Sequence, residues 1–367
     1  MRDQRADALA QILVRYSTRV EKGDVCVIQS TTTAEPLVQA VYEEVLKAGG
    51  LPVMQMTSEG AAAAFYSLAS DEQLEWVAPT STWAVEEADV RIAIMADANA
   101  RELSGTDPKK QARSQQARKP LMDTAMRRSA SGEYRWALTL FPTHAYAAEA
   151  AMSLSDYEDF YYRACLATDG DPVTAWQRQS DEVNRITDWL NGKEQVHIQG
   201  PGTDIKLGVA GRTWVPCSGE HNMPDGETFT GPIEDSVEGE VAFSFPATYG
   251  GREVSGVRFR FEGGRIVDAS AERGEAFLFE MLDTDDGARR IGELGIGCNP
   301  GMNRYMRNIY FDEKMNGTVH VALGGGFEFL GGTNKSAIHW DILKDLRSGG
   351  RIELDGKIVH KDGVWTD

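Results

Sequence analysis

The spacing of apolar segments in the first half of the chain constrains the fold more than any other feature. Short apolar runs at residues 25–28, 51–56 and 90–95 are separated by stretches with helical periodicity, such as residues 34–48. The glycine pair that follows this last stretch is a typical helix stop. Strands separated by helices of this length indicate a parallel sheet. The first half is therefore predicted to be an α/β domain.

The pattern changes near Glu194. Glycine becomes frequent, and short strands follow one another with hairpin turns, one of them at residues 262–265. A single helix, predicted over residues 274–290, interrupts these strands. We therefore predict two domains: an α/β N-terminal domain with a parallel sheet, residues 1–190, and an α+β, mostly antiparallel C-terminal domain, residues 191–367.

The charge balance limits the partners that this chain could bind. Its formal net charge is −18, which would repel nucleic acid and anionic membranes. Its four cysteines lie far apart, a spacing that disfavours disulfides and suits a reducing compartment. No apolar run approaches the roughly 18 residues that span a bilayer. We expect a cytoplasmic protein that binds neither nucleic acid nor membrane.

Both histidines of the last quarter that lie beside carboxylates occupy predicted strands. His339 and Asp341 are two residues apart in a strand, so both project from one face while Ile338, Trp340 and Ile342 face the core. Such a pair could bind one metal ion, or it could be a hydrogen-bonded surface pair.

The second of these histidines, His320, lies in an apolar strand, where a histidine is more often a structural core residue. Asp312 and Glu313 just upstream favour a metal site instead. Three glutamates complete the candidate set: Glu227, Glu293 and Glu313. Glu293 lies in a run of small and apolar residues, where a carboxylate is costly to bury unless it is paired or binds a cation. Glu227 lies in a turn, and taken alone it could be a solvated acid.

This mixture of carboxylates and imidazoles, with no cysteine among the candidates, suits zinc, cobalt, manganese or magnesium. Six ligands exceed what one catalytic ion with an open position uses. Two ions bridged by a carboxylate account better for the number, and such a pair can activate a water molecule for hydrolysis.

At these residues the sequence resembles the thermophilic-type metallo-aminopeptidases, peptidase family M29. The resemblance covers nearly the whole chain, and its most specific stretches are residues 222–230, 286–293, 311–320 and 331–341. It implies that the metal ligands are Glu227, Glu293, Glu313, His320, His339 and Asp341. It also implies a homodimer that releases N-terminal residues from short peptides or amino-acid amides; the general base is not assigned.

One position departs from the family pattern: Phe327 stands where the family has a tyrosine near the metal centre. Three alternatives stay open. Two are other metal-dependent reactions on the same fold: hydrolysis of a non-peptide amide, and iron-dependent oxygenation that opens the ring of 2,5-dihydroxypyridine. The third, which Phe327 makes conceivable, is a catalytically impaired metal-binding homologue. The dioxygenases share the fold but resemble this chain less at two ligand positions, because they have histidine in place of Glu293 and lack His320.

Overall fold

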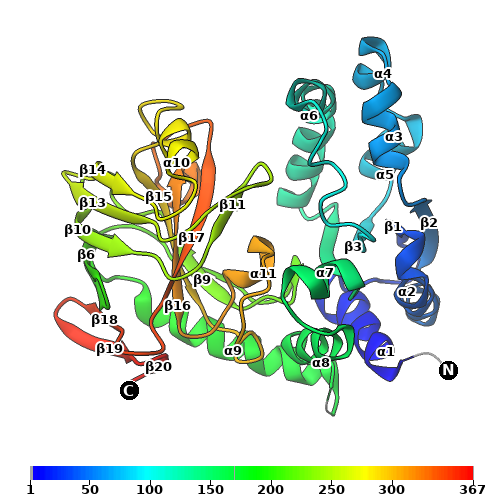
Figure 1. Cartoon of the computed structure of the whole chain (residues 1–367). Helices are drawn as coiled ribbons and strands as arrows, with labels where there is room; N and C mark the ends of the chain where they lie inside the picture. Colours follow the sequence, from blue (N-terminus) through cyan, green and yellow to red (C-terminus); the bar gives the residue numbers. More distant parts are fainter. Residues whose placement is uncertain (1–2, 169, 367) are drawn as a thin grey trace. The chain divides into compact units, whose positions relative to one another are not determined.

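The computed structural model describes residues 3–168 and 170–366. The chain divides into two compact units (Figure 1). One unit contains residues 1–177 and 219–224, and the other contains residues 178–218 and 225–367. The predicted domain boundary between residues 190 and 191 stays a prediction. Within the described ranges, no helix combines the length and the apolar character needed to cross a membrane.

The N-terminal unit is built on a five-stranded parallel sheet with the order β2-β1-β3-β4-β8. The strands are β1 (Val25–Thr31), β2 (Leu51–Thr57), β3 (Val90–Met95), β4 (Arg135–Leu140) and β8 (Asn222–Met223). The α-helices that lie wholly in this unit are α1 (Gln4–Gln11), α2 (Glu35–Ala48), α3 (Ala61–Leu68), α4 (Asp71–Glu75), α5 (Pro79–Glu86), α6 (Pro108–Ala130), α7 (His144–Glu149) and α8 (Leu154–Ala164). The predicted α/β domain with a parallel sheet is confirmed.

The helix α2 shows how the sequence fixes these elements. It begins with a proline in its first turn and ends at Gly49, which adopts a left-handed conformation with φ 87°. Its buried face packs apolar residues such as Leu37, Val41 and Val45. A glycine at this place ends a helix without steric strain, and the chain then turns into β2.

The C-terminal unit contains two antiparallel sheets. The eight-stranded sheet has the order β14-β13-β10-β6-β5-β18-β19-β20, and the five-stranded sheet has the order β17-β16-β15-β9-β7. The first comprises β5 (Gln195–Gly200), β6 (Thr203–Gly208), β10 (Glu238–Ala242), β13 (Arg258–Glu262), β14 (Arg265–Ser270), β18 (Arg351–Leu354), β19 (Lys357–Lys361) and β20 (Val364–Trp365). The second comprises β7 (Val215–Cys217), β9 (Glu227–Thr230), β15 (Ile291–Gly297), β16 (Thr318–Gly324) and β17 (His339–Asp345).

One apolar core joins these two sheets. It includes Val196 and Phe259 from the larger sheet, and Leu294, Val321 and Trp340 from the smaller one. The helices α9 (Pro172–Leu190) and α10 (Glu275–Leu282) add to it, and β11 (Ala247–Tyr249) pairs with β12 (Arg252–Val254) beside the sheets. The predicted α+β, mostly antiparallel fold of this half is confirmed.

The predicted helix over residues 274–290 is too long. The helix α10 ends at Leu282, and turns follow. The carboxylate of Asp285 accepts hydrogen bonds from the backbone N–H groups of Gly287 and Ala288, both at 2.9 Å. An aspartate that satisfies backbone donors in this way favours a turn over a continuing helix.

Candidate metal centre

The candidate ligands lie on one face of the five-stranded sheet, opposite to the core. Glu293 of β15 pairs with Ala322 of β16, which pairs with Asp341 of β17. Cross-strand partners in an antiparallel sheet point to the same side, and residues two apart along a strand do so as well. His320 and His339 are therefore on this face too.

Glu227 reaches the same face from β9, where it pairs with Gly297 of β15. Glu313 comes from the segment after the short helix α11 (Ile309–Asp312), just before β16. The predicted alternation in β17 is confirmed, because Ile338, Trp340 and Ile342 are all buried in the core. The structure thus brings all six predicted site residues into one region of the C-terminal unit.

Within this region the side chains form two groups. Ligand atoms of Glu227, Glu313 and His320 lie within 4.8 Å of one another, and the same holds for Glu293, His339 and Asp341. Glu293 spans both groups, because its Oε1 lies 3.4 Å from Nε2 of His320 and its Oε2 lies 3.2 Å from Nε2 of His339. A carboxylate with one oxygen toward each group is suited to bridge two cations.

Two members of these groups, Glu293 of β15 and His320 of β16, lie in strands whose burial disfavours an isolated charge. Every residue of β15 and β16 is buried. His320 has no solvent exposure, and Glu293 is 5% exposed. An isolated charge in such a place is strongly unfavourable unless it is paired or coordinates a metal. The burial therefore requires that these residues interact with one another or with a cation.

Gly295 provides the space for the imidazole of His320. The two residues pair across β15 and β16, and a Cβ atom built on Gly295 would overlap ring atoms of His320. A side chain at this position would force the imidazole or the strand to shift. The sequence shows Gly295 only as one glycine among several in a strand, so its role is visible only in the structure.

The ring of His339 is oriented by the backbone. Its Nδ1 lies 2.9 Å from the carbonyl oxygen of Gly325, which can accept its N–H. The Nε2 atom is then directed toward Glu293 and toward Asp341, whose Oδ2 is 3.6 Å away. A histidine that donates one N–H to a carbonyl and offers its other nitrogen is typical of metal ligands.

Burial, and after it the proximity of other carboxylates, perturbs the pKa values of the acids of the cluster. Burial raises the pKa of Glu227 to about 8, despite the nearby ammonium of Lys314. Burial also raises the pKa of Asp341 to about 7, and the negative charges of Glu313 and Glu293 act in the same direction. These carboxyl groups are short of positive charge, which a divalent cation would supply.

The pKa of Glu293 shifts downward, whereas the pKa values of the two histidines shift upward. Burial would raise the pKa of Glu293, but its hydrogen bonds with His320 and His339 outweigh this effect and lower the pKa to about 2. Burial would lower the pKa of both histidines, but the hydrogen bonds with Glu293 and the surrounding carboxylates raise it to about 10 for His320 and about 9 for His339. A divalent cation would replace these protons and leave the imidazoles neutral for coordination.

The donor set fits divalent cations by a further observation. Among the described residues, Oε2 of Glu227 and Oδ1 of Asp341 are buried without a hydrogen-bond partner. Buried oxygens normally find a donor. Carboxylate oxygens that accept no hydrogen bond are free to bind a cation, and zinc, cobalt and manganese bind carboxylate oxygens and imidazole nitrogens.

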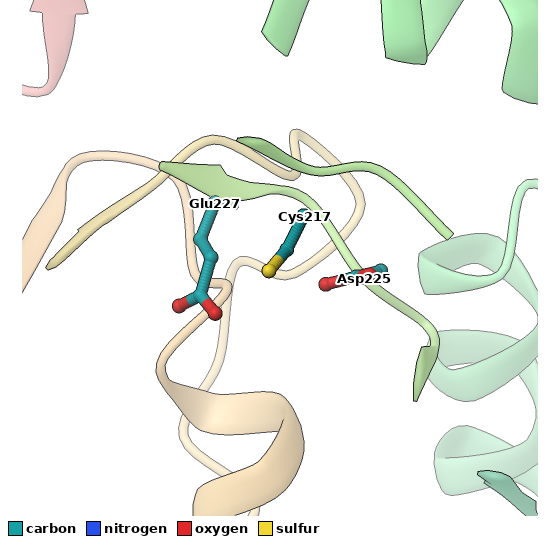
Figure 2. A group of neighbouring side chains, drawn as sticks. All are labelled: Cys217, Asp225 and Glu227. Atoms are coloured by element: carbon teal, nitrogen blue, oxygen red, sulfur yellow. The ribbon is translucent and has the colours of Figure 1, made fainter. Parts of the chain in front are cut away.

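The sequence did not reveal three further residues of this region. Figure 2 shows Cys217 between Asp225 and Glu227, and ligand atoms of these three residues lie within 4.8 Å of one another. Burial raises the pKa of the Cys217 thiol well above its usual value. The buried ammonium of Lys314 donates a hydrogen bond to Glu227 and another, at 2.6 Å, to Glu313. In the sequence, the only indication that these residues lie near the centre is that Asp225 stands two residues before Glu227.

Comparison with known proteins shows what the chain is similar to in sequence and fold. Aminopeptidase T from Thermus thermophilus is 27% identical to this chain, with 98% of this chain and 96% of the relative covered. The solved structure of AmpT from Thermus thermophilus superposes with a TM-score of 0.85 at 26% identity, with 99% of both chains covered. The 2,5-dihydroxypyridine dioxygenase of Pseudomonas putida has a TM-score of 0.61 at 16% identity, over 98% of this chain and 96% of that one, which shows a shared fold alone.

A comparison with models of protein families covers nearly the whole length of the chain. The model of the family described as thermophilic metalloprotease (M29) matches residues 2–365. This match confirms the predicted family and, with it, the prediction of a metal-dependent hydrolase. The chain belongs to the thermophilic metalloprotease family M29.

Proposed function

We propose that this enzyme is an aminopeptidase that binds two divalent metal ions and releases N-terminal residues from short peptides. The observation that carries this proposal is the position of Glu293, whose two oxygens face the two groups of candidate ligands. Glu293 would therefore contribute to the binding of both ions, and a pair of divalent ions would supply the chemistry of a two-metal hydrolase.

The proposed ligands divide between two positions. Glu227, Glu313 and His320 would hold one ion, His339 and Asp341 the other, and Glu293 both. When bound, the cations supply Lewis acidity for the scissile carbonyl and lower the pKa of a water molecule. The protein contributes the fixed orientation of its ligands, in which the carbonyl of Gly325 orients the imidazole of His339.

Similarity to proteins named aminopeptidases supports a peptide or amino-acid amide as the substrate. The dioxygenase alternative is less well supported, because the resemblance to those enzymes requires histidine at the position of Glu293 and no histidine at the position of His320. We also propose that the chain forms a homodimer, as the family resemblance implies, and sedimentation of the purified protein would test this.

The substitution Glu293→Gln tests the proposed function. It keeps the size of the side chain but removes the charge that faces both histidines. We expect loss of one equivalent of bound metal and loss of hydrolysis of aminoacyl amides, measured by elemental analysis and by release of the free amino acid. Glu240→Gln, at an exposed position on β10, is the matched control and should change neither.

The outcome that contradicts the proposal is a Glu293→Gln variant with full activity and two equivalents of metal. Oxygen consumption with iron, in the absence of amide hydrolysis by the wild type, would assign the centre to the dioxygenase reaction instead.

A further inference from the structure

The C-terminal unit contains more groups of potential ligand atoms than the proposed function uses. Beside the two groups joined by Glu293, a third is formed by Cys217, Asp225 and Glu227 (Figure 2). Glu227 belongs to two of the three groups. A third ion at this place would compete for Glu227 with the ion that His320 would bind. Some feature of the protein must therefore decide which groups take metal.

The side chain of Lys314 lies against the same carboxylates. Its Nζ donates hydrogen bonds to Oε1 of Glu227 and to Oε1 of Glu313, the latter at 2.6 Å, and lies 3.8 Å from Oδ1 of Asp225. Lys314 is 1% exposed and is one of the largest fully buried side chains among the described residues. A buried ammonium is strongly unfavourable unless carboxylates surround it, and here three do.

The ion pair between Lys314 and Glu227 also gives the two oxygens of Glu227 different surroundings. Oε1 accepts from Lys314, whereas Oε2 lies 3.5 Å from Nε2 of His320 and has no hydrogen-bond donor in the described part of the chain. The lysine therefore satisfies one oxygen of this carboxylate and directs the other toward His320. Glu313, the third member of that group, is held by the same ammonium.

We propose that Lys314 is a positioning residue that acts as a built-in cation. Its ammonium lies where a metal ion would otherwise balance the charge of the group formed by Cys217, Asp225 and Glu227. It thereby excludes a metal ion from this group. By the same contacts it orients Glu227 and Glu313 toward the ion that His320 would share. This inference rests on the two-ion centre proposed above and adds the reason why the third group takes no metal.

Removal of this ammonium has a defined chemical consequence. Lys314→Met keeps an unbranched side chain of similar length but leaves the carboxylates of Asp225, Glu227 and Glu313 without their cation. A divalent ion is then the natural replacement, and a thiophilic ion such as cadmium would also bind the thiolate of Cys217. Lys314→Arg is the matched control, because it retains a permanent positive charge.

The experiment is a titration with cadmium of the metal-depleted full-length protein, followed by the ultraviolet charge-transfer absorption of a cadmium–thiolate bond and by elemental analysis. In the wild type we expect no thiolate absorption attributable to Cys217, so the spectrum should match that of Cys217→Ser. In Lys314→Met we expect one additional equivalent of cadmium together with new thiolate absorption. Both should disappear in the double variant Lys314→Met/Cys217→Ser, and neither should appear in Lys314→Arg.

The same titration measures the positioning role. Without Lys314, cadmium should bind at least about tenfold more weakly at the group that contains His320, since loss of a residue that orients metal ligands typically costs 10–100-fold in affinity. Lys314→Arg should recover most of this loss.

The inference is wrong if the wild type shows thiolate absorption that Cys217→Ser removes, because a metal ion then occupies the third group despite Lys314. This comparison does not depend on whether Lys314→Met folds. A folded Lys314→Met variant with wild-type stoichiometry, affinity and spectrum would equally overturn the inference. The equivalents bound at the carboxylate–histidine groups test the two-ion proposal separately, because they do not involve sulfur.

Discussion

The substitution Gly295→Ala should displace one metal ligand without removing any functional group. A methyl group at this position would overlap the imidazole of His320, which pairs with Gly295 across two fully buried strands. Because both strands are buried along their whole length, the imidazole must rotate away or the sheet must deform. Overpacking of this kind costs about 1–3 kcal/mol of folding free energy.

Loss of a residue that only orients a metal ligand typically lowers metal affinity by about 10–100-fold. Displacement of the ligand itself should lower the affinity by more than that. We therefore expect at least about 100-fold weaker binding at the position that includes His320, or about 2.8 kcal/mol at 1.4 kcal/mol per tenfold. Calorimetric titration of the metal-depleted protein with cobalt would measure it.

The matched control is Gly231→Ala in the same unit. There a new Cβ would meet its nearest neighbours, the carbonyl oxygen of Gly292 and Cβ of Leu330, at 3.5 Å and 3.8 Å, which are ordinary contacts. This variant should bind both ions as the wild type does. If Gly295→Ala also binds two ions with unchanged affinity and has an unchanged unfolding temperature, then His320 does not depend on this space and the reasoning fails.

Three further predictions follow from the geometry. Chelation of metal should lower the unfolding temperature measured by calorimetry. The reason is that an ion present at 1,000 times its Kd stabilises the folded state by about 4 kcal/mol. An unchanged unfolding temperature would exclude a metal held by the folded chain. Phe327→Tyr should raise kcat on aminoacyl amides by up to about 10²–10³-fold at constant metal content, because a phenol could donate a hydrogen bond to the developing oxyanion. The centre of the Phe327 ring lies 5.4 Å from the centre of the His339 ring. An equal or lower kcat would exclude this role. His360, whose pKa burial lowers from 6.5 to about 4, is neutral in the folded state, so its contribution to stability is present above pH 6.5 and is lost as pH falls toward 4. In urea unfolding of the metal-depleted protein, His360→Phe should therefore lose less stability than the wild type between pH 7 and pH 5, by about 2 kcal/mol; equal losses would show that His360 is not responsible.

The elements that the sequence predicts correctly are those with strong local periodicity. The helix α2 and the strands β1, β2 and β3 follow directly from apolar spacing and from the glycines at Gly49 and Gly50. The helix α10 was predicted eight residues too long, since Asp285 stabilises a turn through its side chain, and apolar spacing alone does not show such a competing hydrogen bond.

The candidate site was predictable to the extent that residue type and strand alternation determine it. His339 and Asp341 share a face because they are two apart in β17, which the sequence shows. That Glu293 lies between His320 and His339 depends on the register of three strands, and a shift of one residue would turn each side chain to the opposite face. The register is a property of the assembled sheet.

Residues that act by contact rather than by type were missed for the same reason. A lysine next to a glutamate in sequence is usually a solvated surface residue, yet Lys314 is buried among Asp225, Glu227 and Glu313. Gly295 has no functional group at all, and only the neighbouring imidazole shows why it must be glycine.

The location of the cluster links metal binding to the stability of the fold. Five carboxylates, those of Asp225, Glu227, Glu293, Glu313 and Asp341, lie close together in the C-terminal unit. Lys314 and the two histidines provide at most three positive charges among them, and the histidines do so only while protonated. Two divalent cations would add four positive charges and release both imidazoles for coordination. The strands β15 and β16 are buried along their whole length, so the charge balance of the centre contributes directly to the stability of the sheet. Metal binding and folding of this unit are therefore expected to be thermodynamically coupled, and a variant that weakens one should weaken the other in proportion.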